Sequence, residues 1–418
     1  MYKVLTSAER FADVTSLLPP DGAFEAAIRN AITLLGASGR DADVRLVFGC
    51  YPVQGVVDAQ AVLGRLTRDL PAGAKLRVAV GNYRSSNLPP SWNHSKIVAA
   101  DGKVAIVGGH NLWGAHYLGK NPVNDVSIRV SGSAAAAAHR FADEQWRYTC
   151  DARTIITRQT WSVRLFSLSA GKVTEDCPTS FADAKVPATT GTGNTPVVAL
   201  GRLAQIDSTG KSNPSDAGLQ AAIGAAKRTV RISQQDLGPP LVPILGIPAS
   251  DWPDALLLQL GAALVRGVDV YIMVSNKGSI AGGLSATDAS YSNGWTPEDL
   301  ARRVRDVIVA SPPVGAPTGA ALTKLLCEKL HVAPLRWLQE DTFPDGTPLP
   351  NHAKLLMVDD QAFYVGSQNL YNAGLTEFGF LVDDRRAGAQ MLSGYYAPLW
   401  ERSRRVAVTG SDAPVCIL

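Results

Sequence analysis

Short apolar segments alternate with longer amphipathic segments along most of the chain. The apolar run over 42–49 is typical of a buried strand, whereas apolar residues recur with helical spacing over 22–36, which ends at a glycine. The second half repeats this order of elements. The expected strands span 8–18, 42–49, 75–83, 227–237, 268–276 and 332–339, and the expected helices span 22–36, 58–70, 254–267, 296–310 and 319–330. Strands that alternate with helices predict an α/β protein built in layers.

A segment rich in Thr, Gly and Pro, AKVPATTGTGNTP, separates the two series of elements and is typical of a linker. A chain of 418 residues is long enough to bury two cores. We therefore expect a first half over 1–168, a linker over 169–195 and a second half over 196–418.

Each half contains one segment in which polar residues interrupt an apolar run. Residues 93–113 align with residues 351–371 without a gap, at an offset of 258 residues, and eight of the 21 positions are identical. The identical pairs are Asn93/Asn351, His94/His352, Lys96/Lys354, Asp101/Asp359, Val107/Val365, Gly108/Gly366, Asn111/Asn369 and Leu112/Leu370. Most of them are polar or glycine rather than core-forming, which indicates a repeated site rather than repeated packing.

The shared spacing is His-x-Lys-x-x-x-x-Asp, with an asparagine 17 residues after the histidine. On a strand, residues two apart project from the same face, so His94 and Lys96 project together, as do His352 and Lys354. A single histidine is more often a core residue than a functional one. Two copies in the same register favour function.

The chemistry of this set suits a phosphate diester. If a pseudo-twofold axis brings the halves together, the shared site holds two imidazoles, two ammonium groups and two amides. Ammonium groups and amides can bind the nonbridging oxygens, while one imidazole attacks phosphorus and the other protonates the leaving oxygen. This chemistry requires no metal ion, and we expect neither a metal nor another cofactor.

The paired motifs resemble those of the phospholipase D superfamily. SWNHSK, PVNDVSI, ISQQDL, DDQAFYVGSQNLY and LTEFGFLV also resemble the secreted bacterial phospholipase D enzymes, with coverage from about residue 8 to 405. The resemblance implies two similar α/β/α halves, each a mixed β-sheet flanked by helices, related by a pseudo-twofold axis. It also implies hydrolysis of the distal phosphodiester of glycerophospholipids, and transfer of the phosphatidyl group to alcohols, through a phosphohistidine intermediate.

The resemblance also assigns roles to residues. It implies His94 as the nucleophile, His352 as the general acid, and an acidic residue beyond each motif that orients its histidine. The candidate catalytic residues are His94, His352, Lys96, Lys354, Asp125 and Glu377, the last in a position where aspartate is more usual. The candidate substrate-binding residues are Asn111, Asn369, Gly109 and Ser367. Asp101 and Asp359, at the hairpin turns, are expected to be structural. We interpret two further histidines, His110 and His116, as loop residues at the entrance to the site.

The net charge limits the range of substrate classes. The formal net charge of +3 is too small to attract nucleic acid by bulk electrostatics, so we expect no nucleic-acid partner and disfavour a nuclease. A phosphodiesterase for a small soluble diester, or a transferase, stays open because substrate choice lies in loops. The presence of both histidines and both lysines argues against an inactive binding protein. The expected partners of this monomer are a phospholipid at a membrane or micelle interface and an alcohol acceptor.

The five cysteines include no C-x-x-C pair, which argues against a structural zinc site. The sequence alone leaves open whether Cys150 and Cys177 are bridged or free; the resemblance favours a bridge. No apolar run is long enough to cross a membrane, and MYKVLTSAER lacks the apolar centre of a signal peptide. The resemblance implies an extracellular protein whose leader is absent from this chain, with a cytoplasmic protein as the alternative.

Overall fold

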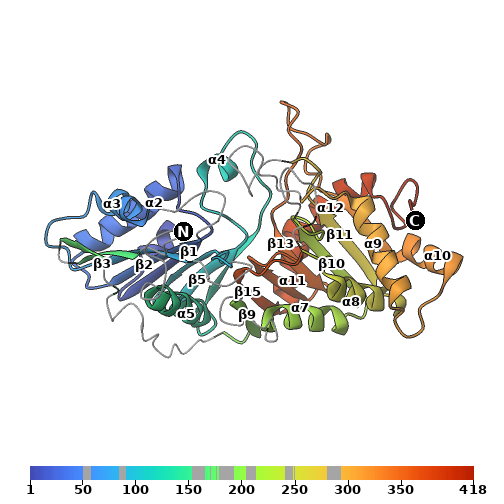
Figure 1. Ribbon diagram of the computed structural model, residues 1–418, viewed down its shortest axis with the longest axis horizontal. Coiled ribbons are helices and arrows are strands. Elements are labelled where there is room, and N and C mark those ends of the chain that lie inside the picture. Colours follow the sequence, from blue (N-terminus) through green and yellow to red (C-terminus); the bar gives the residue numbers. More distant parts are fainter. Residues whose placement is uncertain are drawn as a thin grey trace.

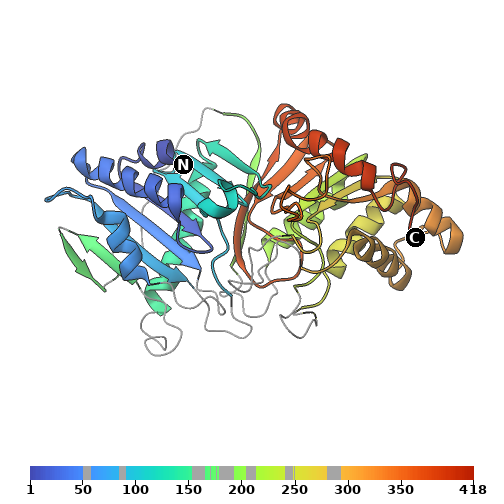
Figure 2. The same cartoon turned by 90° about the horizontal axis from the view of Figure 1, so that it is seen from above.

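The structure is a computed structural model in which the described residues form two lobes side by side (Figure 1). The described residues are 1–49, 58–83, 91–152, 165–169, 171–175, 177, 193–203, 213–240, 248, 250–279 and 293–418. The first lobe comprises those up to Cys177, and the second those from Gly193 onward. The C-terminus lies at the far end of the second lobe (Figure 2). Most of the expected linker, and Cys50, lie outside the described residues.

The first lobe is built on an eight-stranded sheet in the order β6-β5-β4-β1-β2-β3-β7-β8. Its strands are β1 (Phe11–Ser16), β2 (Asp43–Gly49), β3 (Arg77–Tyr83), β4 (Ile97–Ala100), β5 (Val104–Gly108), β6 (Ser127–Ser131), β7 (Leu165–Ser169) and β8 (Lys172–Thr174). Its helices are α1 (Tyr2–Leu5), α2 (Gly22–Ala37), α3 (Ala59–Thr67), α4 (Gly114–Tyr117) and α5 (Ala135–Ala152). The central strands β1, β2 and β3 are parallel, and helices α2 and α3 cover one face of the sheet while α5 covers the other (Figure 1). Coverage on both faces explains why nearly all residues of these strands are buried, including Asp13 and Arg45, which form an ion pair between β1 and β2.

The second lobe is built on a seven-stranded sheet in the order β12-β11-β10-β13-β14-β15-β9. Its strands are β9 (Val197–Leu203), β10 (Thr229–Gln234), β11 (Asp269–Val274), β12 (Leu330–Pro334), β13 (Lys354–Val358), β14 (Ala362–Gly366) and β15 (Thr376–Asp383). Its helices are α7 (Pro214–Ala225), α8 (Asp254–Val265), α9 (Pro297–Ala310), α10 (Gly319–Lys329), α11 (Arg385–Met391) and α12 (Ala397–Ser403), with a π-helical turn (Leu392–Tyr396) and a 3-10 turn (Arg404–Val406) around α12. Strands β10 to β15 occupy the same sheet positions as β1 to β6, which confirms the expected fold class of two similar α/β halves.

One apolar cluster joins the lobes. It contains Val107, Phe141 and Ala138 from the first lobe together with Phe378 and Leu355 from the second. The rings of Phe141 and Phe378 lie 4.9 Å apart between centroids. Each lobe also has a separate core beneath its outer helices. The continuous core fixes the lobes against each other, and the two histidine motifs lie at this junction.

Some element boundaries differ from the expectation. The strand expected over 332–339 spans Leu330–Pro334. Proline is tolerated there because β12 is an edge strand of the described sheet, and the N–H of Leu335 still donates to the carbonyl oxygen of Val274 (2.8 Å). Helices α5 and α7 are not among the elements expected from the sequence. Helix α7 has a weak signal because it is rich in small residues, although Asn213 caps its first turn and Pro214 opens it. Within the described residues, no helix is long and apolar enough to span a bilayer.

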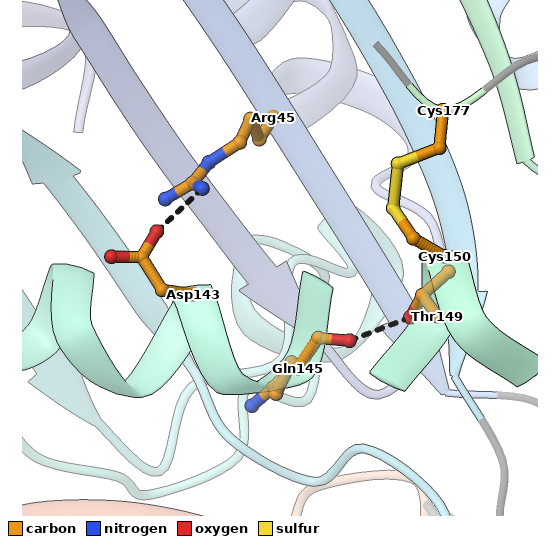
Figure 3. The surroundings of a disulfide bond; sticks show 6 residues. All are labelled: Arg45, Asp143, Gln145, Thr149, Cys150 and Cys177. Carbon is orange, nitrogen blue, oxygen red and sulfur yellow. Dashed lines mark hydrogen bonds and ion pairs between the residues drawn. A yellow bond between two sulfur atoms is a disulfide. The ribbon is translucent and has the colours of Figure 1, made fainter. Parts of the chain in front are cut away.

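Two disulfides tie chain segments to the lobes. Cys150, at the end of α5, is bonded to Cys177, which confirms the bridge that the resemblance favours (Figure 3). A second bridge joins Cys327 on α10 to Cys416, 89 residues later. The second bridge is not expected from the sequence, since cysteines so far apart give no local signal.

Candidate active site

An asparagine before each histidine fixes the entry to its hairpin. The side-chain amide of Asn93 donates to the carbonyl oxygens of Ser16 (2.8 Å) and Val47 (3.3 Å) at the ends of β1 and β2. Asn351 donates in the same way to the carbonyl oxygen of Gln234 at the end of β10 (3.0 Å). Both asparagines are fully buried. Each histidine therefore starts from the carboxyl edge of its parallel strands, where α/β proteins generally place their sites.

The backbone of each motif pairs with the opposite lobe. The N–H of His94 donates to the carbonyl oxygen of Thr376 (2.8 Å), and the N–H of His352 donates to that of Asn124 (2.8 Å). These contacts belong to two equivalent short bridges, Asn93 with Thr376 and Asn124 with Asn351. Thr376 and Asn124 each precede an acidic residue, so each bridge delivers a carboxylate to the histidine across the junction.

The resulting imidazole–carboxylate pairs are crossed between the lobes. Nδ1 of His94 lies 2.9 Å from Oε1 of Glu377, and Nδ1 of His352 lies 2.9 Å from Oδ2 of Asp125. The resemblance implies that each acid orients the histidine of its own motif, but the interlobe bridges impose the opposite pairing. Because an ionised carboxylate only accepts hydrogen bonds, each Nδ1 carries the proton and each Nε2 is left for chemistry. The two ring centroids are 6.5 Å apart, a separation that one phosphorus atom can bridge.

The lysines place two buried cations at the same junction. Nζ of Lys96 donates to the carbonyl oxygen of His94 (2.7 Å), and Nζ of Lys354 donates to that of His352 (2.6 Å). Burial lowers the pKa of Lys354 to about 7, and burial together with the charge of Lys354 lowers the pKa of Lys96. Burial and the charge of Lys96 likewise lower the pKa of His94 to about 4. Burial and mutual repulsion thus disfavour the charged forms of these groups, and a bound anion would favour them again, so the set suits an anionic ligand.

The asparagines of the repeat retain unused hydrogen-bonding capacity. Within the described residues, both polar atoms of the Asn111 side chain are buried without a hydrogen-bond partner, and so is Oδ1 of Asn369. The amide nitrogen of the Asn369 side chain donates to the hydroxyl of Tyr371 (2.8 Å), and its backbone N–H donates to Glu377 (3.2 Å). A buried polar group without a partner costs about 1–3 kcal/mol, which a ligand can recover.

The other two candidate binding residues contact the protein. A side chain at Gly109 would come within 2.1 Å of Oδ1 of Asp125, so a glycine is needed there to admit the carboxylate. The hydroxyl of Ser367 accepts a hydrogen bond from the N–H of Phe378 (3.0 Å) between β14 and β15. Both residues thus help to place the acidic residues or the strands that carry them.

The aspartates of the motifs lie at the hairpin turns, away from the imidazoles. Asp101 accepts hydrogen bonds from the backbone N–H groups of residues 9–11, and Asp359 accepts from those of residues 227–229. Both adopt a left-handed conformation, with φ of 51° and 54°, which aspartate tolerates better than most residues. Each carboxylate fastens its turn to the start of the equivalent strand, β1 in the first lobe and β10 in the second.

Two residues that the sequence analysis did not select also contact the acids. The hydroxyl of Tyr117, on α4, donates to Oδ2 of Asp125 (2.9 Å) and lies 3.2 Å from Nδ1 of His352. The guanidinium of Arg202, on β9, forms an ion pair with Glu377. Neither residue belongs to the repeat. The ring of His110 lies 4.8 Å from that of Tyr117, with the planes tilted by 37°, whereas His116 lies on α4 rather than in a loop and packs against Trp113.

Two lobes with matching sheets, and a histidine and a lysine contributed by each, define a two-lobed α/β protein with a paired-histidine site. The chain belongs to the phospholipase D superfamily, whose members are phosphodiester-acting enzymes. It is 30% identical over 462 aligned positions to a phospholipase D of Streptomyces antibioticus, covering 99% of this chain and 78% of that protein. Over 58 residues, 13% of this chain and 12% of that protein, it is 41% identical to cardiolipin synthase A of Pseudomonas putida (strain GB-1).

The fold is shared with a solved structure at low identity. Phosphatidylserine synthase of Haemophilus influenzae Rd KW20 superposes with a TM-score of 0.58 at 14% identity, covering 96% of this chain and 83% of that one. This similarity shows the common two-lobed fold. No protein-family model matches the chain.

Proposed function

We propose that this protein is a phospholipase D, which cleaves the distal phosphodiester of glycerophospholipids and transfers the phosphatidyl group to water or an alcohol. The observation that carries the proposal is the pair of imidazoles, 6.5 Å apart between centroids and each bonded through Nδ1 to a carboxylate of the opposite lobe. The overall similarity to a phospholipase D of Streptomyces antibioticus supports the choice of a lipid substrate.

In the proposed first step, Nε2 of His94 attacks phosphorus while the bond from phosphorus to the head-group oxygen breaks. His352 donates a proton to that oxygen, and the alcohol leaves. In the second step, water or an acceptor alcohol transfers a proton to His352 and attacks phosphorus, and the bond to Nε2 of His94 breaks. Lys96 and Lys354 stabilise the charge on the nonbridging oxygens, and Asn111 and Asn369 donate hydrogen bonds to them.

The proposed roles require one imidazole neutral and the other protonated. Burial and the charge of Lys354 lower the pKa of His352 well below its ordinary value when no anion is present. A bound phosphate diester adds a negative charge beside both lysines, and this charge favours the protonated ring. We therefore propose that substrate binding itself brings the proton to His352, so that the general acid forms only in the complex.

We further propose that the protein acts outside the cell, as a monomer, at a lipid interface. Two disulfides, Cys150–Cys177 and Cys327–Cys416, support an oxidising compartment. The modest net charge of +3 favours a lipid over a nucleic-acid substrate.

The test offers the purified protein phosphatidylcholine vesicles, a single-stranded oligonucleotide and bis-p-nitrophenyl phosphate in parallel. We expect fastest cleavage of phosphatidylcholine and its loss in the His352→Ala variant. Added ethanol should convert product from phosphatidic acid to phosphatidylethanol without slowing choline release, because the head group departs before the acceptor attacks. Faster cleavage of the oligonucleotide or of the soluble diester would overturn the lipid assignment, and choline release without phosphatidylethanol would contradict transfer.

A further inference from the structure

The two imidazole–carboxylate pairs differ in the groups that contact each carboxylate on the side away from its histidine. Strand β15, which carries Glu377, pairs with β9, and Arg202 is the residue directly opposite Glu377 in that pairing. The counterpart of β15 in the first lobe is β6, which is the edge strand of its sheet as described. In the described structure, the acid of His94 therefore has a strand behind it that the acid of His352 lacks.

The extra strand supplies a buried cation. Oε1 of Glu377 faces Nδ1 of His94, whereas Oε2 is bound by a terminal nitrogen of Arg202, and the Arg202 and Glu377 side chains are 7% and 0% exposed. The other terminal nitrogen of Arg202 lies 3.5 Å from Asp216 at the start of α7. Burial alone would raise the pKa of Glu377, but the charge of Arg202 and the contact with His94 hold it below its usual value. Arg202 thus keeps Glu377 ionised while it also offsets part of the charge that His94 experiences.

Among the described residues, no guanidinium binds the other acid, although, against the effect of burial, the charges of His110 and Lys354 also lower the pKa of Asp125. Asp125 is bound by the hydroxyl of Tyr117 (2.9 Å) and by the backbone N–H of Val126 (2.8 Å) in addition to His352. A phenol polarises a carboxylate but does not cancel its charge. The two halves of the site therefore differ electrostatically, because a guanidinium binds Glu377 and a phenol binds Asp125.

This asymmetry matters for the bond between His94 and phosphorus. Once Nε2 is phosphorylated, the ring carries positive charge that its Nδ1–H shares with Glu377. A carboxylate without a counter-ion would hold that charge more strongly or take the Nδ1 proton, and either change makes imidazole a poorer leaving group. Offsetting the carboxylate charge keeps the ring a good leaving group and the intermediate short-lived.

We propose that Arg202 is a positioning residue that acts through Glu377 to shorten the lifetime of the phosphohistidine on His94. The inference rests on the proposed function and adds a residue outside both repeated motifs. The groups that face the pair are Lys96, Lys354 and His352 on the side of His94, and Asp216 and Tyr364 on the side of Arg202. All of these groups remain in an Arg202 variant, so the variant measures the effect of the guanidinium separately from theirs.

The test compares Arg202→Met with Arg202→Lys, which keeps the charge, and with Arg231→Met. Arg231 is a matched control because it lies on β10 of the same sheet and pairs with Asp360 (2.7 Å), which does not contact the histidines. Arg202→Gln, which keeps a donor to Glu377 without the charge, replaces the methionine variant if that does not fold. Phosphohistidine is trapped by rapid alkaline quench during turnover of phosphatidylcholine, and choline release is followed in the same samples.

We expect Arg202→Met to raise the steady-state ratio of phosphorylated to free enzyme about tenfold, the effect of a one-unit change in effective pKa. Choline should appear as a burst followed by a slower steady rate. The lysine variant and Arg231→Met should match the unmodified protein. Slower choline release with an unchanged phosphorylated fraction would overturn the proposal, because it would show that Arg202 acts only on the first step or on the fold.

A second readout does not need turnover. Histidine NMR titration of the substrate-free protein, with His94 assigned through its alanine variant, should show that the His94–Glu377 pair takes up its proton at a pH about 1 to 3 units higher in Arg202→Met. An unchanged titration would overturn the inference even if the protein is an active phospholipase. If the unmodified protein cleaves no diester, the proposed function fails, whereas the titration still decides whether Arg202 controls this pair.

Discussion

Replacing Asp101 with alanine is expected to destabilise the fold and to leave the chemistry of the site intact. The carboxylate is 2% exposed and accepts backbone N–H groups of Glu9 (2.7 Å), Arg10 (2.9 Å) and Phe11 (3.0 Å). Water can replace it at the first two, which belong to exposed residues, but not at the buried Phe11. One lost buried partner, two weakened contacts and an alanine held at positive φ together amount to about 3–5 kcal/mol.

Urea unfolding followed by circular dichroism measures this loss, and kcat/KM per folded molecule measures the chemistry. Asp101→Asn should lose about 2 kcal/mol less than alanine, since asparagine tolerates the left-handed conformation and keeps one acceptor. Asp359→Ala, at the more exposed equivalent turn, should lose less than Asp101→Ala. A folded Asp101→Asn protein that is about a hundredfold less active would refute the reasoning, because it would place this carboxylate in the reaction.

Three further predictions concern the site and its frame. His94→Ala and His352→Ala should each abolish turnover. Because both imidazoles act on one bond, the double variant should be no slower than the worse single variant. A double variant whose steady-state rate falls by the product of the two single losses would contradict a shared site. As pH rises through 7, Lys354 loses its charge in the free enzyme, so kcat/KM should fall; a flat profile from about pH 6 to 9 would contradict this. Replacing Cys327 and Cys416 with serine opens an 89-residue loop and should cost about 4–5 kcal/mol in urea unfolding, whereas an unchanged midpoint would show that the bridge does not stabilise the fold.

The paired site could be predicted because its information is local. His94 and Lys96 are two residues apart, and the turn at Asp101 and the return to Asn111 follow within one hairpin, so spacing alone describes the geometry of each motif. The gap-free repeat of this spacing then indicates that two such hairpins serve one site. The same logic placed the parallel strands, whose apolar runs reflect burial on both faces.

What sequence reasoning missed depends on contacts between segments far apart. The crossing of Glu377 to His94 depends on an interlobe bridge at Thr376, and no spacing within one motif reports it. Arg202 belongs to a strand outside the repeat, so a comparison of the two halves passes over it. The resemblance implies Gly109 as a binding residue, and no spacing within its motif reports that the space it leaves holds the carboxylate of Asp125.

The crossed pairs also determine when the site can form during protein synthesis. During synthesis the first lobe leaves the ribosome while Glu377 has not yet been translated, and domains generally fold as they emerge. At that stage His94 lacks the carboxylate that orients it, and His352 does not exist. The nascent chain therefore cannot assemble the paired site until the strands that carry His352 and Glu377 have been made and have docked on the first lobe.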